Sequence, residues 1–258
     1  MTLRDRLTCL CANVAQDFRL FGWAAVPYFV DRALARASAG RVRLHKYWIV
    51  AQPVEPPALR KGSAFEVWTV TESNARYEDY PRPAAVIRER FRQGGQCLAA
   101  YRNDVFVGYI WFNLGPYHED EVRCRFVPQP EGRASWDYDA FVVERYRLGR
   151  AFKLLWTAAM ESLYAHGVIV SYSRISAFNA GSLAAHTRLG AERVATLYFL
   201  RIGKVQWMLG TLTPYFGISF APSCPPTVCV GPKRIGPRVR SIQGNGERLD
   251  NHHNGPRL

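Results

Sequence analysis

Residues 138–151 decide the fold of this chain: Tyr138-Asp139-Ala140-Phe141-Val142-Val143-Glu144-Arg145-Tyr146-Arg147-Leu148-Gly149-Arg150-Ala151. The first part is apolar, as in a buried strand, and it is followed by a short Arg/Gly turn and the start of a helix. A turn of this kind directs free backbone N–H groups at an anion, with the positive end of the helix dipole behind them. The stretch therefore predicts a strand–turn–helix unit suited to a phosphorylated ligand.

A second stretch, Asn179-Ala180-Gly181-Ser182-Leu183-Ala184-Ala185-His186-Thr187-Arg188-Leu189-Gly190-Ala191, predicts a short helix. Asn179 can cap its first turn, because an asparagine side chain accepts a hydrogen bond from a free N–H there. Gly190 is a suitable residue for its end.

Hydrophobic periodicity predicts the remaining elements. We expect helices over 12–37, 84–91, 149–166 and 179–189, and strands over 42–50, 65–71, 96–101, 105–114, 121–127, 133–143, 168–173, 193–201 and 206–212. Arg102-Asn103-Asp104 has the composition of a hairpin turn. Residues 51–63 form a Pro-rich linker, and residues 213–258 are rich in Pro, Gly and Arg and predict a disordered tail.

The net charge of +13 is concentrated outside the central region. Residues 1–63 carry ten Lys/Arg against four Asp/Glu, residues 64–212 carry 18 against 15, and residues 213–258 carry six against two. Such basic segments suit anionic lipid, a phosphorylated cofactor, an acidic carrier protein or nucleic acid. Nucleic acid is the disfavoured partner, because no nucleic-acid-binding motif is present. A basic composition without any ligand role is the alternative.

The apolar stretch from Leu20 to Val30 is too short to span a bilayer, which needs about 20 residues. Its aromatic residues and the arginines around it predict peripheral contact of residues 19–43 with a membrane surface. A helix packed on the main domain is the alternative. The six cysteines lack metal-ligand spacing and the chain starts without a signal-peptide pattern, so we expect no metal site and a cytoplasmic protein, at most peripheral to the inner face of the membrane.

The order of elements across residues 64–212 resembles the GNAT superfamily of acyltransferases. The resemblance implies an α/β (α+β) fold: a central mixed, mostly antiparallel sheet that is splayed at the central strand and flanked by helices. Residues 1–63 would add a basic helix–strand extension, and residues 213–258 the disordered tail.

In that family the splayed strand pairs with the pantetheine arm of coenzyme A, and the turn after it holds the pyrophosphate. The resemblance therefore implies acetyl-CoA or another acyl-CoA as co-substrate, without a metal. The implied cofactor-binding residues are Phe141, Val142, Val143, Arg147, Leu148, Gly149, Arg150, Ala151, Asn179 and Ser182. The chain departs from the family turn at Tyr146, where a Gln or Arg is usual.

The family often has a tyrosine, which protonates the departing thiolate, where this chain has His186. Histidine can donate a proton near neutrality, so His186 is a candidate catalytic acid; a surface histidine without that role is the alternative. Asp137 and Asp139 are two residues apart on the central strand and should share one face. Either is a candidate base for the acceptor amine, and a hydrogen-bonded strand carboxylate is the alternative.

The resemblance implies an N-acyltransferase in which a small-molecule or peptide amine attacks the thioester directly. Two alternatives stay open. One is a catalytically inactive protein of this fold that binds CoA or a partner. The other is a long-chain acyltransferase that uses an acyl carrier protein and acts on a cell-envelope precursor.

Overall fold

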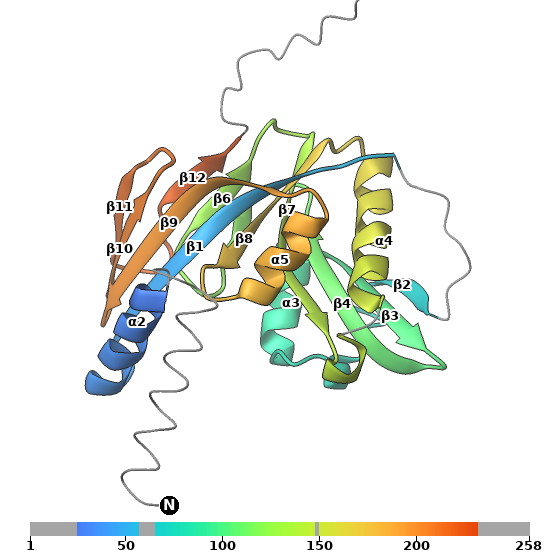
Figure 1. The fold of residues 1–258 in the computed structure, drawn as a ribbon, viewed down its shortest axis with the longest axis horizontal. Helices are drawn as coiled ribbons and strands as arrows, with labels where there is room; N and C mark the ends of the chain where they lie inside the picture. The colour runs from blue at the N-terminus through green and yellow to red at the C-terminus, as the bar shows by residue number, and fades with distance from the viewer. Residues whose placement is uncertain (1–24, 57–64, 148–149, 232–258) are drawn as a thin grey trace, which may run out of the picture.

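The computed structural model describes residues 25–56, 65–147 and 150–231 (Figure 1). A nine-stranded sheet organises them, in the order β11-β10-β9-β1-β8-β7-β4-β3-β2. The strands are β1 (Val42–Pro53), β2 (Glu66–Val70), β3 (Gln96–Arg102), β4 (Val105–Asn113), β7 (Ala134–Val142), β8 (Val170–Ser176), β9 (Glu192–Ile202), β10 (Val205–Gly210) and β11 (Phe216–Ser219). All neighbours are antiparallel except β7 and β8.

Helices cover both faces of the sheet. On one face, α3 (Ala84–Arg92) packs Ile87 and Phe91 into a core with Trp111 of β4. On the other face, α4 (Ala151–Ala165) packs Leu155 against the alternate β4 residues, such as Phe112. The helices α5 (Ala180–Arg188) and α2 (Ala25–Ala37) complete this second layer, with α2 packed on β1 (Figure 1). The predicted fold class, a mixed and mostly antiparallel sheet flanked by helices, is confirmed.

A second sheet packs on the nine-stranded sheet and encloses a third hydrophobic cluster, besides those under α3 and α4. It has the order β12-β6-β5, with β5 (Tyr117–His118), β6 (Arg125–Pro128) and β12 (Thr227–Val230). Val228 and Val230 of β12 are fully buried beside Phe126 of β6 and Phe199 of β9. The prediction of a disordered tail is therefore wrong for residues 213–231, which supply β11 and β12; residues 232–258 lie outside the described residues. The prediction failed here because prolines flank the two strands and each strand is only four residues long.

The predicted boundary at residue 63 is also wrong as a structural division. β1 lies between β8 and β9, and it pairs with both along most of its length. Tyr47 and Ile49 of β1 are fully buried. β1 also continues to Pro53, so the first residues of the predicted linker belong to the strand.

Most predicted elements of the central region are confirmed within a few residues. The hairpin between β3 and β4 turns at Asn103 and Asp104, both with positive φ (49° and 62°), a conformation that Asn and Asp tolerate well. Gly167 (φ 73°) ends α4 as predicted. Of the helix predicted over 12–37, residues 25–37 are helical and residues 12–24 lie outside the described residues.

Because β1 is central, we expect Ile49→Ala to lower the free energy of unfolding of the whole protein by about 3 kcal/mol. Urea denaturation followed by circular dichroism should show one shifted transition. Val30→Ala on α2, where the side chain is 39% exposed, is the control and should change little. A separate early transition, with the main one unmoved, would mean that β1 belongs to an independent unit.

Candidate functional site

The central strands β7 and β8 separate partway along their length. Their pairing runs from Ala134 and Val170 to Asp137 and Ser173. Beyond this point β7 stays paired with β4 as far as Val142, and β8 stays paired with β1 as far as Ser176. The side of β7 that faces β8 thus has no strand partner from residue 138 to 142 within the described part of the chain. This is the splay predicted at the central strand.

A β-bulge lies at the point of separation. Trp111 of β4 pairs with Asp139, but the next residue, Phe112, pairs with Asp137, so Tyr138 is the extra residue. A bulge of this kind shifts the alternation of side chains by one. Asp139 therefore lies on the α3 face with Trp111, and Asp137 lies on the α4 face with Phe112. The prediction that the two aspartates share one face is wrong, because it assumed an unbroken strand.

Asp137 is buried at the point where β7 and β8 begin to separate. Its carboxylate accepts hydrogen bonds from the hydroxyls of Ser171, at 2.9 Å, and of Ser173, both on β8. Burial raises the pKa of Asp137 to about 7, although the two hydroxyls act in the opposite direction. A carboxyl group here changes its protonation near neutrality, but its side chain is only 7% exposed.

Asp139 is ion-paired on the other face. Its Oδ2 lies 2.7 Å from Nη1 of Arg90 and 3.3 Å from Nε of Arg82, and it accepts a hydrogen bond from the Tyr109 hydroxyl at 2.9 Å. Arg90 is only 2% exposed and also reaches Asp120 at 2.8 Å. An incoming amine would compete with two guanidinium groups for the Asp139 carboxylate. Arg90 thus joins α3, β7 and the loop at 119–124.

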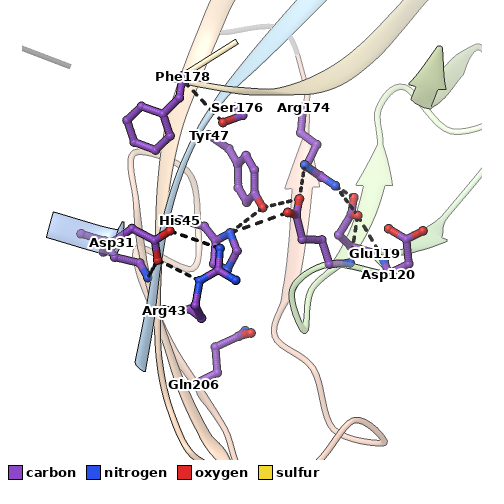
Figure 2. A network of polar contacts seen from close by, with 12 residues as sticks. Asp31, Arg43, His45, Tyr47, Glu119, Asp120, Arg174, Ser176, Phe178 and Gln206 are labelled. Atoms are coloured by element: carbon purple, nitrogen blue, oxygen red, sulfur yellow. Dashed lines mark hydrogen bonds and ion pairs between the residues drawn. The ribbon is translucent and has the colours of Figure 1, made fainter. Parts of the chain in front are cut away.

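A second arginine, Arg174, lies on the β8 side of the separation with its side chain 12% exposed (Figure 2). Arg174 is the first β8 residue after the pairing with β7 ends. It makes a bidentate ion pair with Glu119, in which both N–O distances are 2.7 Å. Its Nη1 also lies 2.9 Å from a carboxylate oxygen of Glu121. Forked pairing to carboxylates is the geometry that favours arginine over lysine.

Tyr47 and His45 of β1, which lie beside Arg174 in Figure 2, form a hydrogen-bonded chain that ends at Glu121. The Tyr47 hydroxyl donates to Glu121 at 2.7 Å, and Nδ1 of His45 lies 3.1 Å from the same hydroxyl. Since a carboxylate only accepts, the Tyr47 hydrogen points at Glu121 and Nδ1 of a neutral His45 carries the other hydrogen. Burial lowers the pKa of His45, which favours this neutral form. For Glu121, burial acts to raise the pKa, but Arg174 and Tyr47 outweigh it and lower the pKa.

A cavity adjoins this polar network. It is lined by the loop at 118–124 together with Arg201, Gln206, Pro222 and Pro225. Gln206 holds the loop in place, because its amide accepts from the Arg123 N–H at 2.9 Å and donates to the Arg123 carbonyl at 2.7 Å. Glu121, whose side chain is 48% exposed, is the half-open member of the network.

The predicted phosphate turn follows β7 directly. Glu144–Tyr146 form one turn of 3₁₀ helix, and α4 begins at Ala151 with Arg150 at its N-cap. The Arg150 side chain makes no capping bond, and the first turn of α4 contains no acid. Nε of Arg147 donates to the Val142 carbonyl at 3.0 Å. Leu148 and Gly149, predicted to bind pyrophosphate, lie outside the described residues.

The residues predicted to contact pantetheine differ in whether their backbone N–H and C=O groups are already hydrogen-bonded. The Val143 N–H is donated to Val107 and its carbonyl accepts from Tyr146, so both of its backbone groups are engaged. Phe141 and Val142 lie in the part of β7 that has no strand partner on the β8 side, but the Val142 carbonyl accepts from Nε of Arg147. At Phe141 the backbones of β4 and β7 approach closely, because a side chain at Gly108 would overlap the Phe141 carbonyl.

The second predicted segment forms α5. Asn179 caps it, accepting a hydrogen bond from the Ser182 N–H at 2.9 Å, as expected. His186 is only 4% exposed and packs edge-on against Trp156 of α4, with ring centroids 4.8 Å apart. Burial lowers the pKa of His186 to about 4, so the imidazole is neutral at pH 7. The structure thus places this candidate acid in the contact between α4 and α5.

Sequence reasoning missed the residues that are most densely connected, namely His45, Tyr47, Arg90, Glu119, Glu121 and Arg174. One signal was present: Glu119-Asp120-Glu121 is a run of three acids in a basic chain. A second signal was Arg174, a charged residue directly after the apolar strand predicted over 168–173.

Within residues 25–56, 65–147 and 150–231, no group of three or more His, Cys, Asp or Glu side chains is arranged to hold a metal ion. Among the helices of those ranges, none has the length and apolar character needed to cross a membrane.

No protein-family model and no curated protein matches the chain. Several solved structures resemble it in part. A tandem GNAT protein from the clavulanic acid biosynthesis pathway is 14% identical, with a TM-score of 0.46 over 66% of this chain and 57% of that chain. A GNAT-family acetyltransferase structure from Novosphingobium aromaticivorans is 13% identical, with a TM-score of 0.44 over 61% and 65%. An aminoglycoside acetyltransferase from an uncultured soil sample is 11% identical, with a TM-score of 0.37 over 48% and 86%.

The chain spans less than two thirds of the length of the first two of these proteins. All three TM-scores are below 0.5, so the reaction and the site have to be argued from the chain's own residues.

Arg90→Met should lower the free energy of unfolding by about 3 kcal/mol, because it leaves the carboxylates of Asp139 and Asp120 without their buried partner. Urea denaturation at neutral pH measures the change. Arg92→Met, on the same helix but exposed, should shift stability by less than about 0.5 kcal/mol. Equal small effects would show that the buried ion pairs contribute nothing net.

Asp137→Asn should remove one pH dependence of stability. In the unfolded chain this carboxyl ionises near pH 4, whereas the folded protein retains the proton to about pH 7. Between these values the folded state binds more protons, so the stability from this group falls as pH rises and is then constant. The stability of the variant minus that of wild type should therefore grow from pH 4 to pH 7, by up to about 4 kcal/mol.

Denaturation at a series of pH values checks this, with the exposed Glu131→Gln as control. Parallel curves for wild type and Asp137→Asn would contradict the raised pKa.

Proposed function

We propose that this chain is an N-acyltransferase that moves an acyl group from acyl-CoA to an amine, with acetyl-CoA as the default donor. The observation that carries the proposal is the separation of β7 from β8 directly before a cationic turn and helix start. A strand edge without a partner offers N–H and C=O groups to an extended ligand, and pantetheine contains two amides. A helix start without a capping side chain offers N–H groups to a phosphate.

The charges of the turn fit a pyrophosphate. Arg145, Arg147, Arg150 and Lys153 are exposed around the start of α4, and Glu144 is the acid in the same segment. Guanidinium groups bind phosphate oxygens through two parallel hydrogen bonds. Asn179 and Ser182 at the start of α5 are engaged with each other, so we assign them to shaping the helix start rather than to direct phosphate contact.

The acceptor would approach from the α3 face, where the loop cavity and Glu121 lie. In the reaction the amine nitrogen forms a bond to the thioester carbon and the C–S bond breaks. The amine loses one proton and the thiolate gains one. The main contribution of the protein is to position the two reactants, with β7 backbone N–H groups near the bulge polarising the carbonyl.

Proton removal from the amine is assigned to Glu121, directly or through water. Asp137 is buried, and Asp139 is held by two arginines. Glu121 is paired with one arginine only, Arg174, and is half exposed, and the Tyr47–His45 chain behind it connects it to β1. His186 does not supply the thiolate proton, because a pKa of about 4 leaves its imidazole neutral at pH 7 and a neutral imidazole N–H is a far weaker acid than a thiol. The departing thiolate therefore takes its proton from solvent.

Calorimetric titration with CoA, acetyl-CoA and octanoyl-CoA tests the donor site. We expect micromolar binding that Arg150→Glu weakens about ten-fold or more, since it reverses a charge at the helix start. Arg133→Glu, an exposed change at the opposite end of β7, is the matched control and should leave affinity unchanged. Absence of binding by the wild type would favour a carrier-protein donor or a fold that has lost CoA.

Release of free thiol from acetyl-CoA in the presence of spermidine, an aminoglycoside or a lysine peptide tests turnover. Glu121→Gln should reduce the turnover rate about a hundred-fold or more at unchanged CoA affinity, and Glu131→Gln should not. CoA binding without thiol release for any amine would favour the inactive, CoA-binding alternative.

A further inference from the structure

The outer face of the strands β9, β10 and β11 is apolar and uncovered by any described residue. The strands lie at one end of the sheet, and in Figure 1 no helix of the described ranges lies over β10 and β11. Their inner side chains, such as Leu197, Phe199 and Met208, are fully buried in the core under the second sheet. The side chains that alternate with them point the other way.

Apolar side chains, exposed or half-buried, form continuous rows across this outer face. Tyr198 pairs with Leu209, and Leu209 pairs with Phe216, so these three side chains lie side by side. The next row contains Leu200, Trp207 and Ile218. Ile202 and Val205 follow in a third row. Leu209 is 57% exposed, Phe216 52% and Ile218 41%. Tyr215 and Phe220, at the ends of β11, are more exposed still, at 65% and 70%.

An antiparallel sheet face that is open to water normally carries polar side chains. An exposed apolar area of several rows instead indicates an interaction surface. We define the outer face by Tyr198, Ile202, Leu209, Phe216, Ile218 and Phe220.

The charges around the outer face are almost all positive. The cationic side chains there are Arg32 and Arg36 on α2, Arg41 between α2 and β1, Lys46 on β1 and Lys204 in the β9–β10 turn, whose Gly203 N–H donates to the Arg41 carbonyl. No Asp or Glu occurs from residue 193 to residue 231. From residue 25 to residue 53 the one acid is Asp31, which is buried and paired with Arg43. Glu192 and Glu55 lie toward the opposite end of β9 and β1.

We propose that the outer face docks on the surface of an anionic lipid membrane. Aromatic and aliphatic side chains surrounded by Lys and Arg are suited to the interface between acyl chains and anionic headgroups. A second copy of the chain fits less well, because a symmetric contact would place the same cationic residues opposite one another. Nucleic acid would satisfy the cations but not the aliphatic side chains Ile202, Leu209 and Ile218.

This surface is distinct from the proposed donor site, which lies between β7 and β8. The proposal does not depend on acyl transfer, and CoA affinity should be the same in all variants below. It would place the catalytic domain beside a lipid surface.

Sedimentation of the full chain with vesicles tests the proposal. Vesicles of phosphatidylcholine with phosphatidylglycerol should bind the protein, and vesicles of phosphatidylcholine alone should bind it much less. Leu209→Ser/Phe216→Ser should weaken binding about ten-fold or more through lost apolar burial. Lys46→Gln/Lys204→Gln should weaken it about five-fold for each charge.

Val105→Ser/Tyr164→Ser and Arg92→Gln/Arg102→Gln are the matched controls, because they change side chains on β4, α4, α3 and β3, away from the outer face. Thermal unfolding verifies that each variant is folded. Loss of vesicle binding in the two outer-face variants, with both controls unchanged, supports the proposal.

Three results would overturn it. One is the absence of binding to anionic vesicles. Another is binding that the outer-face variants leave unchanged, which would assign the contact to other segments. The third is self-association, or binding of a single-stranded RNA, that depends on Leu209 and Phe216 while vesicles are not bound.

Discussion

The separation of β7 from β8 after Asp137 and Ser173 is the constraint on which the candidate site depends. A sheet of nine strands would ordinarily keep its backbone groups paired, and here one strand edge inside the sheet is left open. The bulge at Tyr138 accompanies this opening, and bulges both bend a strand and end its pairing. Because of the same bulge, Asp137 and Asp139 lie on opposite faces of the sheet. The bulge therefore determines which carboxylate lies on each face as well as how the strand bends.

Two arginines, Arg90 fully buried and Arg174 mostly buried, join the separated strands to the elements on the α3 face. Arg90 joins α3 to β7 through Asp139, and Arg174 joins β8 to the loop at 119–124 through Glu119. Burying charges is unfavourable unless their geometry is good and their remaining groups are satisfied. Both arginines meet two carboxylates each. Such networks favour a single defined arrangement of the strands and the loop that they join.

The segments outside the central region do structural work. β1 lies in the middle of the sheet, and β12 closes the core around Phe199 and Val228. These segments supply β1 and the edge strand β11 to the nine-stranded sheet. Within the described part of the chain, β10 and β11 are covered on their inner face only. The proposed donor cleft and the uncovered apolar face are therefore separate features of one sheet.

The local features of this protein follow from its sequence alone. Asn103 and Asp104 select the hairpin turn, Asn179 caps α5, Gly167 ends α4, and the apolar alternation marks most strands, because each of these depends on residues close in the chain. Features that depend on residues far apart in the chain were determined only by the tertiary structure. The place of β1 between β8 and β9 depends on partners more than 100 residues away. The bulge depends on the register with β4, and the burial of His186 depends on Trp156. Sequence periodicity carries no record of such partners, so the opposite faces of Asp137 and Asp139 and the pairing of Arg174 with Glu119 could be read only from the folded chain.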